Sequence, residues 1–401
     1  MITRVVAVDP AEFARDHWGR APLLSRSADL PHDFQDLLSP DAVDELIAER
    51  GVRTPFIRLA RDGSVLDRTW FTGSAGFGAE MPDQIDSAKV SAEFVAGATI
   101  VLQGLHRVWP PIIDFVRSMV DDLGHPVQTN AYVTPPSNRG FDPHYDVHDV
   151  FVLQVSGEKH WAIHPPVHAD PLPNQPWTDH RDAIAALDGT RPVIDAVLRP
   201  GDALYLPRGW IHSATALGDT SIHLTVGVAP FTRYDLAHRV LTNLENNDDL
   251  RRSLPMTLDL TDVGAVGAEV RKTVETILEA LRADSTVEST VAQAIGTRFA
   301  ELTRPAAVRP IRTLNAVANL TGTSEVTWRH GLIGTVRRNP ASVDLVLPDR
   351  TVTFPSLCAD ALDAVRSGRT VTADSLPGLT EEDGLVVVRR LLREAVVVAL
   401  A

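Results

Sequence analysis

The stretch "PHYDVHDVFVLQVSGEKHWAIHP", from Pro143 to Pro165, decides how the rest of this sequence is understood. It places four histidines, two aspartates, one glutamate and one lysine within an apolar pattern typical of strands. Polar groups at this density on a half-buried strand cost free energy unless a partner or a ligand satisfies them. The stretch therefore predicts strands that carry a binding site.

Several short strand-like segments lie around this stretch, between about residues 126 and 230. They are "QTNAYVTPP", "DVFVLQVSG", "KHWAIHP", "DAVLRPGDALYLP" and "SIHLTVGVAP", with Gly- or Pro-containing turns between them. Short β-branched and aromatic segments with frequent turn signals predict an antiparallel sandwich or barrel. The Pro- and Asp-rich segment 167–192 predicts a surface loop with a short helix.

The flanking regions have different patterns. Residues 1–125 indicate mixed structure, including an amphipathic helix in "VWPPIIDFVRSMVDDLG" that ends at Gly124. After residue 230 helices dominate, and "VGAEVRKTVETILEALRAD" carries one apolar stripe. That stripe is compatible with dimerisation or with a core-facing helix; its members are Val270, Val274, Ile277, Leu278 and Leu281.

The tail from 310 to 401 combines a predicted hairpin in "SVDLVLPDRTVTF" with two predicted helices, a combination that favours a winged-helix module. Residues 311–401 contain ten Arg and ten Asp or Glu residues. DNA-binding winged helices carry basic patches, so a neutral one favours a protein-interaction or structural role.

Composition narrows the possible functions. The 401 residues carry a formal net charge of −14, which argues against binding the phosphate backbone of nucleic acid as the main function. Cys358 is the only cysteine, so neither an intramolecular disulfide nor a multi-cysteine zinc finger can form. No signal peptide or transmembrane segment is evident, and a cytoplasmic location is expected. Lysine is rare: the chain has only Lys89, Lys159 and Lys272.

His144 and Asp146 suggest two arms of a metal site, because residues two apart on a strand share a face. Two histidines and one carboxylate with open positions are typical of non-haem Fe(II) oxygenases. His148 would stretch three ligands over about 13 Å of one strand. His212, in "RPGDALYLPRGWIHSATAL", is the better second histidine if a barrel brings its strand alongside. An H-x-D pair alone is equally compatible with a sandwich carrying incidental surface polar residues.

Longer motifs support the metal-site interpretation. The segments "TNAYVTPPSNRGFDPHYDVHDVFVLQVSGEKHW", "GDALYLPRGWIHSA" and "SIHLTVG" resemble the cupin-like JmjC oxygenases of the ribosomal oxygenase group. So do "FARDHWGRAPLL" and "GATIVLQGLHR" near the N-terminus. The resemblance covers about the whole chain and is strongest over 128–228. It implies a mainly β fold with helices: a double-stranded β-helix (jelly-roll, cupin) catalytic domain at 1–230, a helical dimerisation region at 231–309 and a winged helix at 310–401.

The same resemblance implies the site and its cofactors. Fe(II) would be bound by His144, Asp146 and His212, with 2-oxoglutarate as co-substrate and O2 as oxidant. Lys159 matches the family position that contacts the far carboxylate of 2-oxoglutarate, a task that suits a compact point charge. Further positions that match the co-substrate pocket are Asn130, Tyr132 and, more weakly, Thr225.

The resemblance makes none of the remaining histidines near these motifs a metal ligand. We expect His148 to lie on the metal face near the substrate, and His160 and His164 to be structural or exposed. His223 is expected to be a hydrogen-bonded core residue.

The resemblance implies a 2-oxoglutarate-dependent dioxygenase that hydroxylates a protein side chain, most often on a ribosomal protein. It also implies a homodimer, whereas composition and charge predict no membrane partner and no direct contact with nucleic acid. One alternative is a hydroxylase of a peptide natural product or small molecule. Another is a catalytically silent metal-binding regulator that uses its winged helix.

Overall fold

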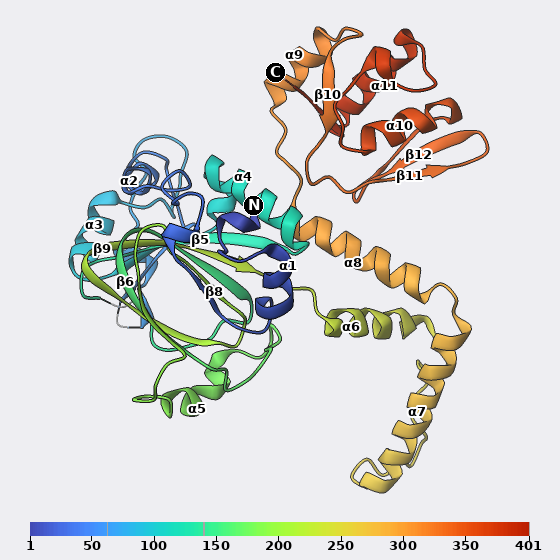
Figure 1. Ribbon diagram of the computed structural model, residues 1–401. Helices are drawn as coiled ribbons and strands as arrows, with labels where there is room; N and C mark the ends of the chain where they lie inside the picture. Colours follow the sequence, from blue (N-terminus) through green and yellow to red (C-terminus); the bar gives the residue numbers. More distant parts are fainter. Residues whose placement is uncertain (62, 139–140, 401) are drawn as a thin grey trace. The chain divides into compact units, whose positions relative to one another are not determined.

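The computed structural model describes residues 1–61, 63–138 and 141–400. Arg139 and Gly140, inside the longest family-like motif, and Ala401, at the end of the predicted winged helix, lie outside the described residues. The chain divides into two compact units, Met1–Pro230 and Phe231–Ala401. Each unit is described by itself (Figure 1).

One antiparallel sheet of nine strands forms the first unit. In order across the sheet, the strands are β1 (Leu23–Ser25), β8 (Ala203–Leu206), β6 (Asp149–His164), β9 (Ile211–Val228), β5 (Val127–Thr134), β4 (Thr99–Leu102), β2 (Ile57–Arg61) and β3 (Ser64–Val65), with β7 (Ile194–Leu198) also paired to β6. The prediction of an antiparallel β core is confirmed.

The two longest strands correct the predicted strand boundaries. "DVFVLQVSG" and "KHWAIHP" are not separate strands joined by a turn, because both belong to the continuous 16-residue β6. Likewise, "SIHLTVG" is the second half of the 18-residue β9, which begins at Ile211. The Gly-containing segment between the predicted strands is an irregularity inside β6, where the register against β9 shifts at Gln154–Ser156 and again at Ser156–Glu158.

This bulge changes which face of β6 lines an internal cavity. Before it, Val150 and Val152 line an internal cavity; after it, Lys159 and Trp161 line the same cavity. Side chains alternate along a strand, so a regular strand would send residues 150 and 159 to opposite faces. The extra residue in the bulge shifts this alternation by one, so Lys159 faces the same cavity as Val150.

Helices cover the sheet and its edges in the first unit. The α4 helix (Pro110–Leu123) ends at left-handed Gly124, as predicted, and packs Phe115 and Met119 into the main core beside Phe151. The predicted surface segment 167–192 contains a 3₁₀ turn at Trp177–His180 and α5 (Arg181–Ala185), as expected. The remaining α-helices are α1 (Pro10–Glu12), α2 (Pro40–Ala48) and α3 (Ser87–Val95).

The second unit begins with helices and ends in a small α/β module. Its helices are α6 (Arg233–Asn243), α7 (Val263–Ala283), α8 (Val287–Thr303), α9 (Pro310–Ala318), α10 (Ala359–Arg366) and α11 (Glu381–Arg393). Two three-stranded sheets follow the orders β14 (Val371–Thr372), β10 (Glu325–Trp328), β15 (Val397–Ala399) and β11 (Thr335–Arg338), β12 (Ser342–Val346), β13 (Thr351–Pro355). The predicted hairpin is the β12–β13 pair.

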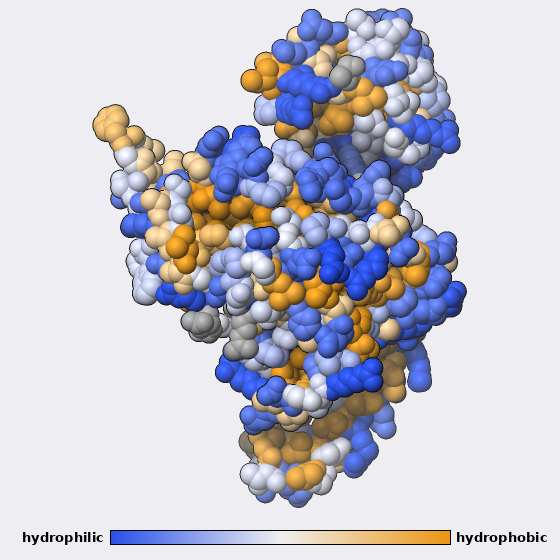
Figure 2. All heavy atoms as spheres, turned by 60° about the vertical axis from the view of Figure 1, so that its left-hand side comes forward, coloured by the Kyte–Doolittle hydropathy of each residue, from blue (hydrophilic) through white to orange (hydrophobic). Residues whose placement is uncertain are grey.

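The apolar stripe of α7 faces solvent. Val270, Val274 and Leu278 are 55%, 48% and 46% exposed, and no described residue of α7 is fully buried. Figure 2 shows apolar atoms among polar ones on the arm that contains α7, at the bottom of that view. In this single chain the stripe is therefore not a core face.

Among the residues that the structure describes, every helix is too short or too polar to span a bilayer.

The bulge of β6 gives a stability prediction. Gly157 has φ +62°, and a Cβ there would lie 2.3 Å from the carbonyl oxygen of Thr220, whereas Gly218 has φ +60° with open space around it. Both alanine substitutions pay the left-handed backbone cost of about 1–2 kcal/mol. Gly157→Ala should lower the free energy of unfolding by about 1–3 kcal/mol more than Gly218→Ala. The reason is that the new methyl group at residue 157 also forces β6 and β9 apart, whereas the one at residue 218 has open space. Urea unfolding of both variants measures this difference, and equal losses would contradict it.

Candidate metal and co-substrate site

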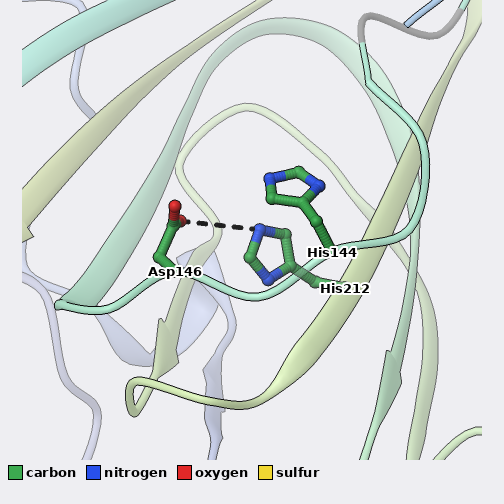
Figure 3. Close-up of side chains that lie close together, drawn as sticks. All are labelled: His144, Asp146 and His212. Atoms are coloured by element: carbon green, nitrogen blue, oxygen red, sulfur yellow. Dashed lines mark ion pairs between the residues drawn. The ribbon is translucent and has the colours of Figure 1, made fainter. Parts of the chain in front are cut away.

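Three polar side chains converge at the start of β9. Their potential ligand atoms, from His144, Asp146 and His212, all lie within 4.8 Å of one another (Figure 3). The Nε2 of His212 is 3.7 Å from Oδ2 of Asp146, and the two imidazole centroids are 4.5 Å apart. The structure thus brings together the three predicted metal ligands, although His212 lies 66 positions after Asp146 in the sequence.

The route by which they meet differs from the sequence-based expectation. Residues 144–148 do not form a regular strand, since β6 begins only at Asp149. Instead, His144 and His212 form an isolated antiparallel bridge, with reciprocal backbone N–H···O distances of 3.2 and 2.9 Å. The amide of Gly209 also donates to the Asp146 carbonyl at 3.0 Å. The backbone, rather than strand alternation, holds the cluster together.

Hydrogen bonds set which nitrogen of each histidine is free. Nδ1 of His144 lies 2.6 Å from the Asp142 carbonyl, and Nδ1 of His212 lies 3.0 Å from the Trp210 carbonyl. A carbonyl only accepts, so each Nδ1 carries the proton and each Nε2 keeps a lone pair. This is the arrangement by which a neighbouring carbonyl orients a metal-binding imidazole.

The protonation of the cluster also suits a cation. Burial, helped by the charge of His144, lowers the pKa of His212 to about 4, so its imidazole is neutral at pH 7. Burial acts to raise the pKa of Asp146, but His148, His212 and His144 together hold it below the ordinary carboxyl value. The neutral His212 imidazole and the Asp146 carboxylate can therefore donate electron pairs to a divalent metal without losing protons first.

The cluster lines a cavity of about 590 Å³, a volume that includes the solvent at its opening. Its lining residues come from β4, β5, β6, β9 and the loop before β6: Thr99, Tyr132, Phe141, His144, Asp146, Val150, Val152, Lys159, Trp161, His212, Ser213, Ala214, His223 and Thr225. One end of this cavity is therefore the candidate metal cluster.

Lys159 is a buried basic residue in the lining of this cavity. It is 4% exposed, and its Nζ donates to the Thr134 hydroxyl at 3.1 Å. Among the described residues it has no ion pair, and burial lowers its pKa to about 7. A buried ammonium without a carboxylate is costly, so an anionic ligand would be strongly favoured at this point.

Aromatic side chains form the walls around Lys159. The Tyr132 ring stacks on His223 with centroids 5.0 Å apart and planes at 5°, and Trp161 meets His223 edge-on at 5.5 Å. Nδ1 of His223 and Nε1 of Trp161 are buried without a hydrogen-bond partner among the described residues. These polar atoms could bind a ligand with oxygen acceptors and donors.

Other predicted site residues fall in different places. Thr225 lines the cavity, whereas Asn130 does not; the Asn130 side-chain oxygen accepts the Gly104 amide at 3.0 Å. His148 does not line the cavity. Its Nε2 lies 3.2 Å from the position that a Cβ at Gly227 would occupy. His223 is buried as expected, but its Nδ1 lacks the expected hydrogen bond.

His160 and His164 face away from the cavity, as expected for histidines that are not ligands. His160 pairs with Asp195 at 2.5 Å, and Nδ1 of His164 lies 3.3 Å from the Thr190 hydroxyl.

Sequence reasoning missed two threonines of the site: Thr99, which lines the cavity, and Thr134, which accepts a hydrogen bond from Lys159 outside the lining. Thr134 continues the alternation of Asn130 and Tyr132 along β5, so strand periodicity could have identified it. Thr99 lies on β4 and hydrogen-bonds Thr134 at 3.3 Å, a contact that depends on sheet order and leaves no local signal.

The mainly β fold and the two-histidine, one-carboxylate cluster define the cupin-like class of metal-binding proteins. Within that class, residues 110–236 match the family described as the JmjC domain. That segment contains all three cluster residues and every strand from β5 to β9. The chain resembles the JmjC oxygenases of the ribosomal oxygenase group, as the sequence motifs predict.

Curated relatives agree with this assignment. Ribosomal oxygenase 1 from Gallus gallus is 30% identical over 260 residues, which cover 63% of this chain and 41% of the relative. The bifunctional lysine-specific demethylase and histidyl-hydroxylase NO66 from Drosophila persimilis is 28% identical over 276 residues, 65% of this chain and 36% of that protein. The chain thus spans less than half the length of these curated relatives.

Solved structures show the fold over nearly the whole chain. The ribosomal oxygenase YcfD from Escherichia coli is 21% identical with a TM-score of 0.55, and the match covers 98% of each chain. A YcfD structure with cobalt and 2-oxoglutarate gives a TM-score of 0.53 at 17% identity, with 99% of each chain covered. This chain therefore has a JmjC, cupin-like fold.

The buried lysine gives a pH-dependent stability prediction. The pKa of Lys159 is 10.5 in the unfolded chain and about 7 in the folded protein. Between these two pH values mainly the unfolded chain binds the proton. The free energy of unfolding therefore falls as the pH drops through that range. Lys159→Met removes this penalty. Without metal or ligand, it should raise the free energy of unfolding by about 1–4 kcal/mol at pH 7. The gain should shrink towards zero near pH 10.5.

Urea unfolding at several pH values, with Lys89→Met as the control, measures this effect. Lys89 sits on the exposed part of α3 and donates to the Thr72 carbonyl, so its removal should show no such pH trend. A pH-independent effect of Lys159→Met would contradict the prediction.

Proposed function

We propose that this protein is an Fe(II)- and 2-oxoglutarate-dependent dioxygenase that hydroxylates a side chain of a ribosomal protein. The observation that carries the proposal is the position of an uncompensated buried Lys159 in the same cavity as a cluster of two histidines and one aspartate. A metal ion bound by the cluster and a carboxylate bound by Lys159 would correspond to Fe(II) and the far carboxylate of 2-oxoglutarate.

The donor set fits Fe(II). His144, Asp146 and His212 would hold the metal, because two imidazoles and one carboxylate that leave positions open suit non-haem Fe(II). Lys159 would bind the far carboxylate of 2-oxoglutarate, with the Thr134 hydroxyl beside it. Tyr132 and Thr225 would line the pocket between these ends. Asn130 is not included, because its side chain already binds a backbone amide outside the cavity.

The bound iron, co-substrate and O2 would supply the oxidation that places a hydroxyl group on an unactivated carbon. The chain's own residues fix geometry and exclude water. The carbonyls of Asp142 and Trp210 keep both histidine Nε2 atoms aimed inward. Val150, Val152 and Trp161 form an apolar wall that keeps the co-substrate in one orientation.

The relatives support a ribosomal protein as substrate, since both a curated relative and a structural neighbour are named ribosomal oxygenases. The acidic chain, with a net charge of −14, is suited to a basic target. A peptide natural product or a small molecule is the alternative substrate class. A ribosomal target also agrees with the expected cytoplasmic location.

The second unit would serve assembly rather than chemistry. The exposed stripe of Val270, Val274 and Leu278 supports the proposal that residues 231–309 form a homodimer contact. For 310–401 we propose a winged-helix module. Support comes from its β12–β13 hairpin, its separate hydrophobic core and helices α9, α10 and α11. Its near-neutral charge favours a structural role over binding nucleic acid.

Titration of the metal-free chain tests the site. His144→Ala should weaken Co(II) or Fe(II) binding by more than about 100-fold, because losing even an outer partner of a ligand typically costs 10–100-fold. His164→Ala, at the end of β6 and outside the cavity lining, is the control and should bind metal normally. Lys159→Ala should raise the 2-oxoglutarate requirement while metal affinity stays unchanged.

The readouts are metal calorimetry and the weak visible band that Fe(II) and 2-oxoglutarate form together under anaerobic conditions. If the wild-type chain forms no band and no succinate, the enzyme proposal fails and the silent-regulator alternative gains support. Equal loss of metal and 2-oxoglutarate binding in Lys159→Ala would mean that the lysine belongs to the metal site.

Intact masses of ribosomal proteins test the substrate. In a strain that lacks this protein, one ribosomal protein should be lighter by one oxygen atom than in the parent strain, and the wild-type gene should restore it. A gene carrying His144→Ala is the matched control and should not. Unchanged masses throughout would reject the ribosomal target and favour a peptide natural product or small molecule.

A further inference from the structure

Arg58, on β2, is a partly buried guanidinium that forms no ion pair with any residue that the structure describes. Its Nε is buried and has no hydrogen-bond partner in that part of the chain either. Arg61 on the same strand differs, because it pairs with Glu93 at 3.3 Å. A partly buried guanidinium without a partner costs free energy, so Arg58 favours an anionic ligand.

The sheet places Arg58 on the face that lines the inner cavity. A row of directly opposite residues crosses β2, β4, β5 and β9: Arg58, Val101, Tyr132 and His223. Directly opposite residues of an antiparallel sheet share a face. Tyr132 and His223 both line the cavity, so Arg58 extends from the cavity face at a position two strands beyond Tyr132.

The Arg58 guanidinium lies towards the metal cluster. Its Cζ is 5.6 Å from the centroid of the Phe141 ring, and that ring is 6.0 Å from the ring of His144. Burial raises the pKa of the Tyr132 hydroxyl, and Arg58 beside it acts in the opposite direction. Burial also acts to raise the pKa of Asp146, and Arg58 is one of the charges that hold it down. Arg58 is therefore close to two lining side chains and to a candidate metal ligand.

Two cations thus serve one cavity, with Lys159 in its lining and Arg58 on the side of the metal cluster. Asp146 is the only carboxylate among the described lining residues, and a bound metal would engage it. Asn130, the polar side chain expected in this pocket, is occupied by the Gly104 amide. Two positive side chains without a free carboxylate suit a ligand that carries two negative groups.

We propose that Arg58 binds the second carboxylate of a dicarboxylate whose first carboxylate pairs with Lys159. Arginine suits this position, because its planar fork can bind a carboxylate through two parallel hydrogen bonds. The second carboxylate then lies on the metal side of the cavity. That this dicarboxylate is 2-oxoglutarate rests on the proposed oxygenase function, whereas the pairing of two cations with two carboxylates does not.

Calorimetric titration of the full-length chain with two small acids tests the proposal. Glutarate carries two carboxylates, and pentanoate has the same chain length with only one. Saturating Co(II) is present throughout, so that the metal engages Asp146. Arg58→Gln should weaken glutarate binding about five- to twentyfold, as expected for the loss of charge-assisted hydrogen bonds at a partly buried site. Pentanoate binding should change by less than about twofold, because Lys159 alone holds its carboxylate.

Arg61→Gln is the matched control, since it removes the same charge from the same strand at a residue already paired with Glu93. It should leave the affinities for both acids at their wild-type values. Lys159→Met should weaken both acids. Arg58→Lys, which keeps the charge, should retain most of the affinity for glutarate. Co(II) affinity in Arg58→Gln should equal or exceed the wild-type value, because a positive charge near Asp146 is lost.

Three results would overturn the assignment of Arg58. They are an unchanged glutarate affinity in Arg58→Gln, equal weakening of glutarate and pentanoate, and loss of Co(II) binding, which would mean that the guanidinium supports the fold of the site instead. A wild-type chain that binds glutarate no better than pentanoate would overturn it as well. If glutarate follows the expected pattern but Fe(II) with 2-oxoglutarate gives neither the visible band nor succinate, only the oxygenase function is rejected.

Discussion

The bulge in β6 is the constraint on which the site depends. A strand that stayed regular from Asp149 to His164 would turn either Val150 or Lys159 away from the interior. The register shifts around Ser156 let apolar residues line the first half of the cavity and a cation line the second. They also place His160 and His164 on the opposite face, where they line a second depression that likewise includes His212. One irregularity thus determines both surfaces that meet at the cluster.

The second constraint is the backbone bridge between His144 and His212. Its two hydrogen bonds fix the Cα positions of two candidate ligands, and the carbonyls of Asp142 and Trp210 then fix the rotation of their rings. Nearby, the Asp149 carboxylate accepts from the Arg208 amide at 2.9 Å and from the Tyr205 hydroxyl at 2.8 Å. The turn that precedes His212 is therefore held before any metal arrives. Such preorganisation lowers the cost of ordering ligands upon binding.

Much of this arrangement was predictable from the sequence, and the failures have identifiable causes. The antiparallel core, α4 with its Gly124 cap and the β12–β13 hairpin follow from periodicity and turn residues. The three cluster residues followed from the motifs, together with the possibility that a barrel would bring His212 to His144.

The predicted turn in "SGEK" was wrong, because a glycine with positive φ is equally at home in a turn and in a bulge. Only the pairing of Ser156 with Ile222 and of Glu158 with Leu217 decides between them, and that pairing is not local in sequence. Thr99 escaped detection for the same reason, since its contact with Thr134 depends on which strands are neighbours. Asn130 fits the periodicity of the site, yet the nearby Gly104 amide occupies its side chain.

The depressed pKa of Lys159 makes the inner cavity a proton acceptor as well as a receptor for anions. Near neutral pH the amine at this position therefore exchanges between its charged and uncharged forms, since burial lowers its pKa to about 7. A carboxylate that docks there stabilises the ammonium form, so each binding event draws a fraction of a proton from solution. Under the proposed function, binding of 2-oxoglutarate is then coupled to proton uptake. A modest rise in pH would weaken the binding of 2-oxoglutarate without changing any metal ligand.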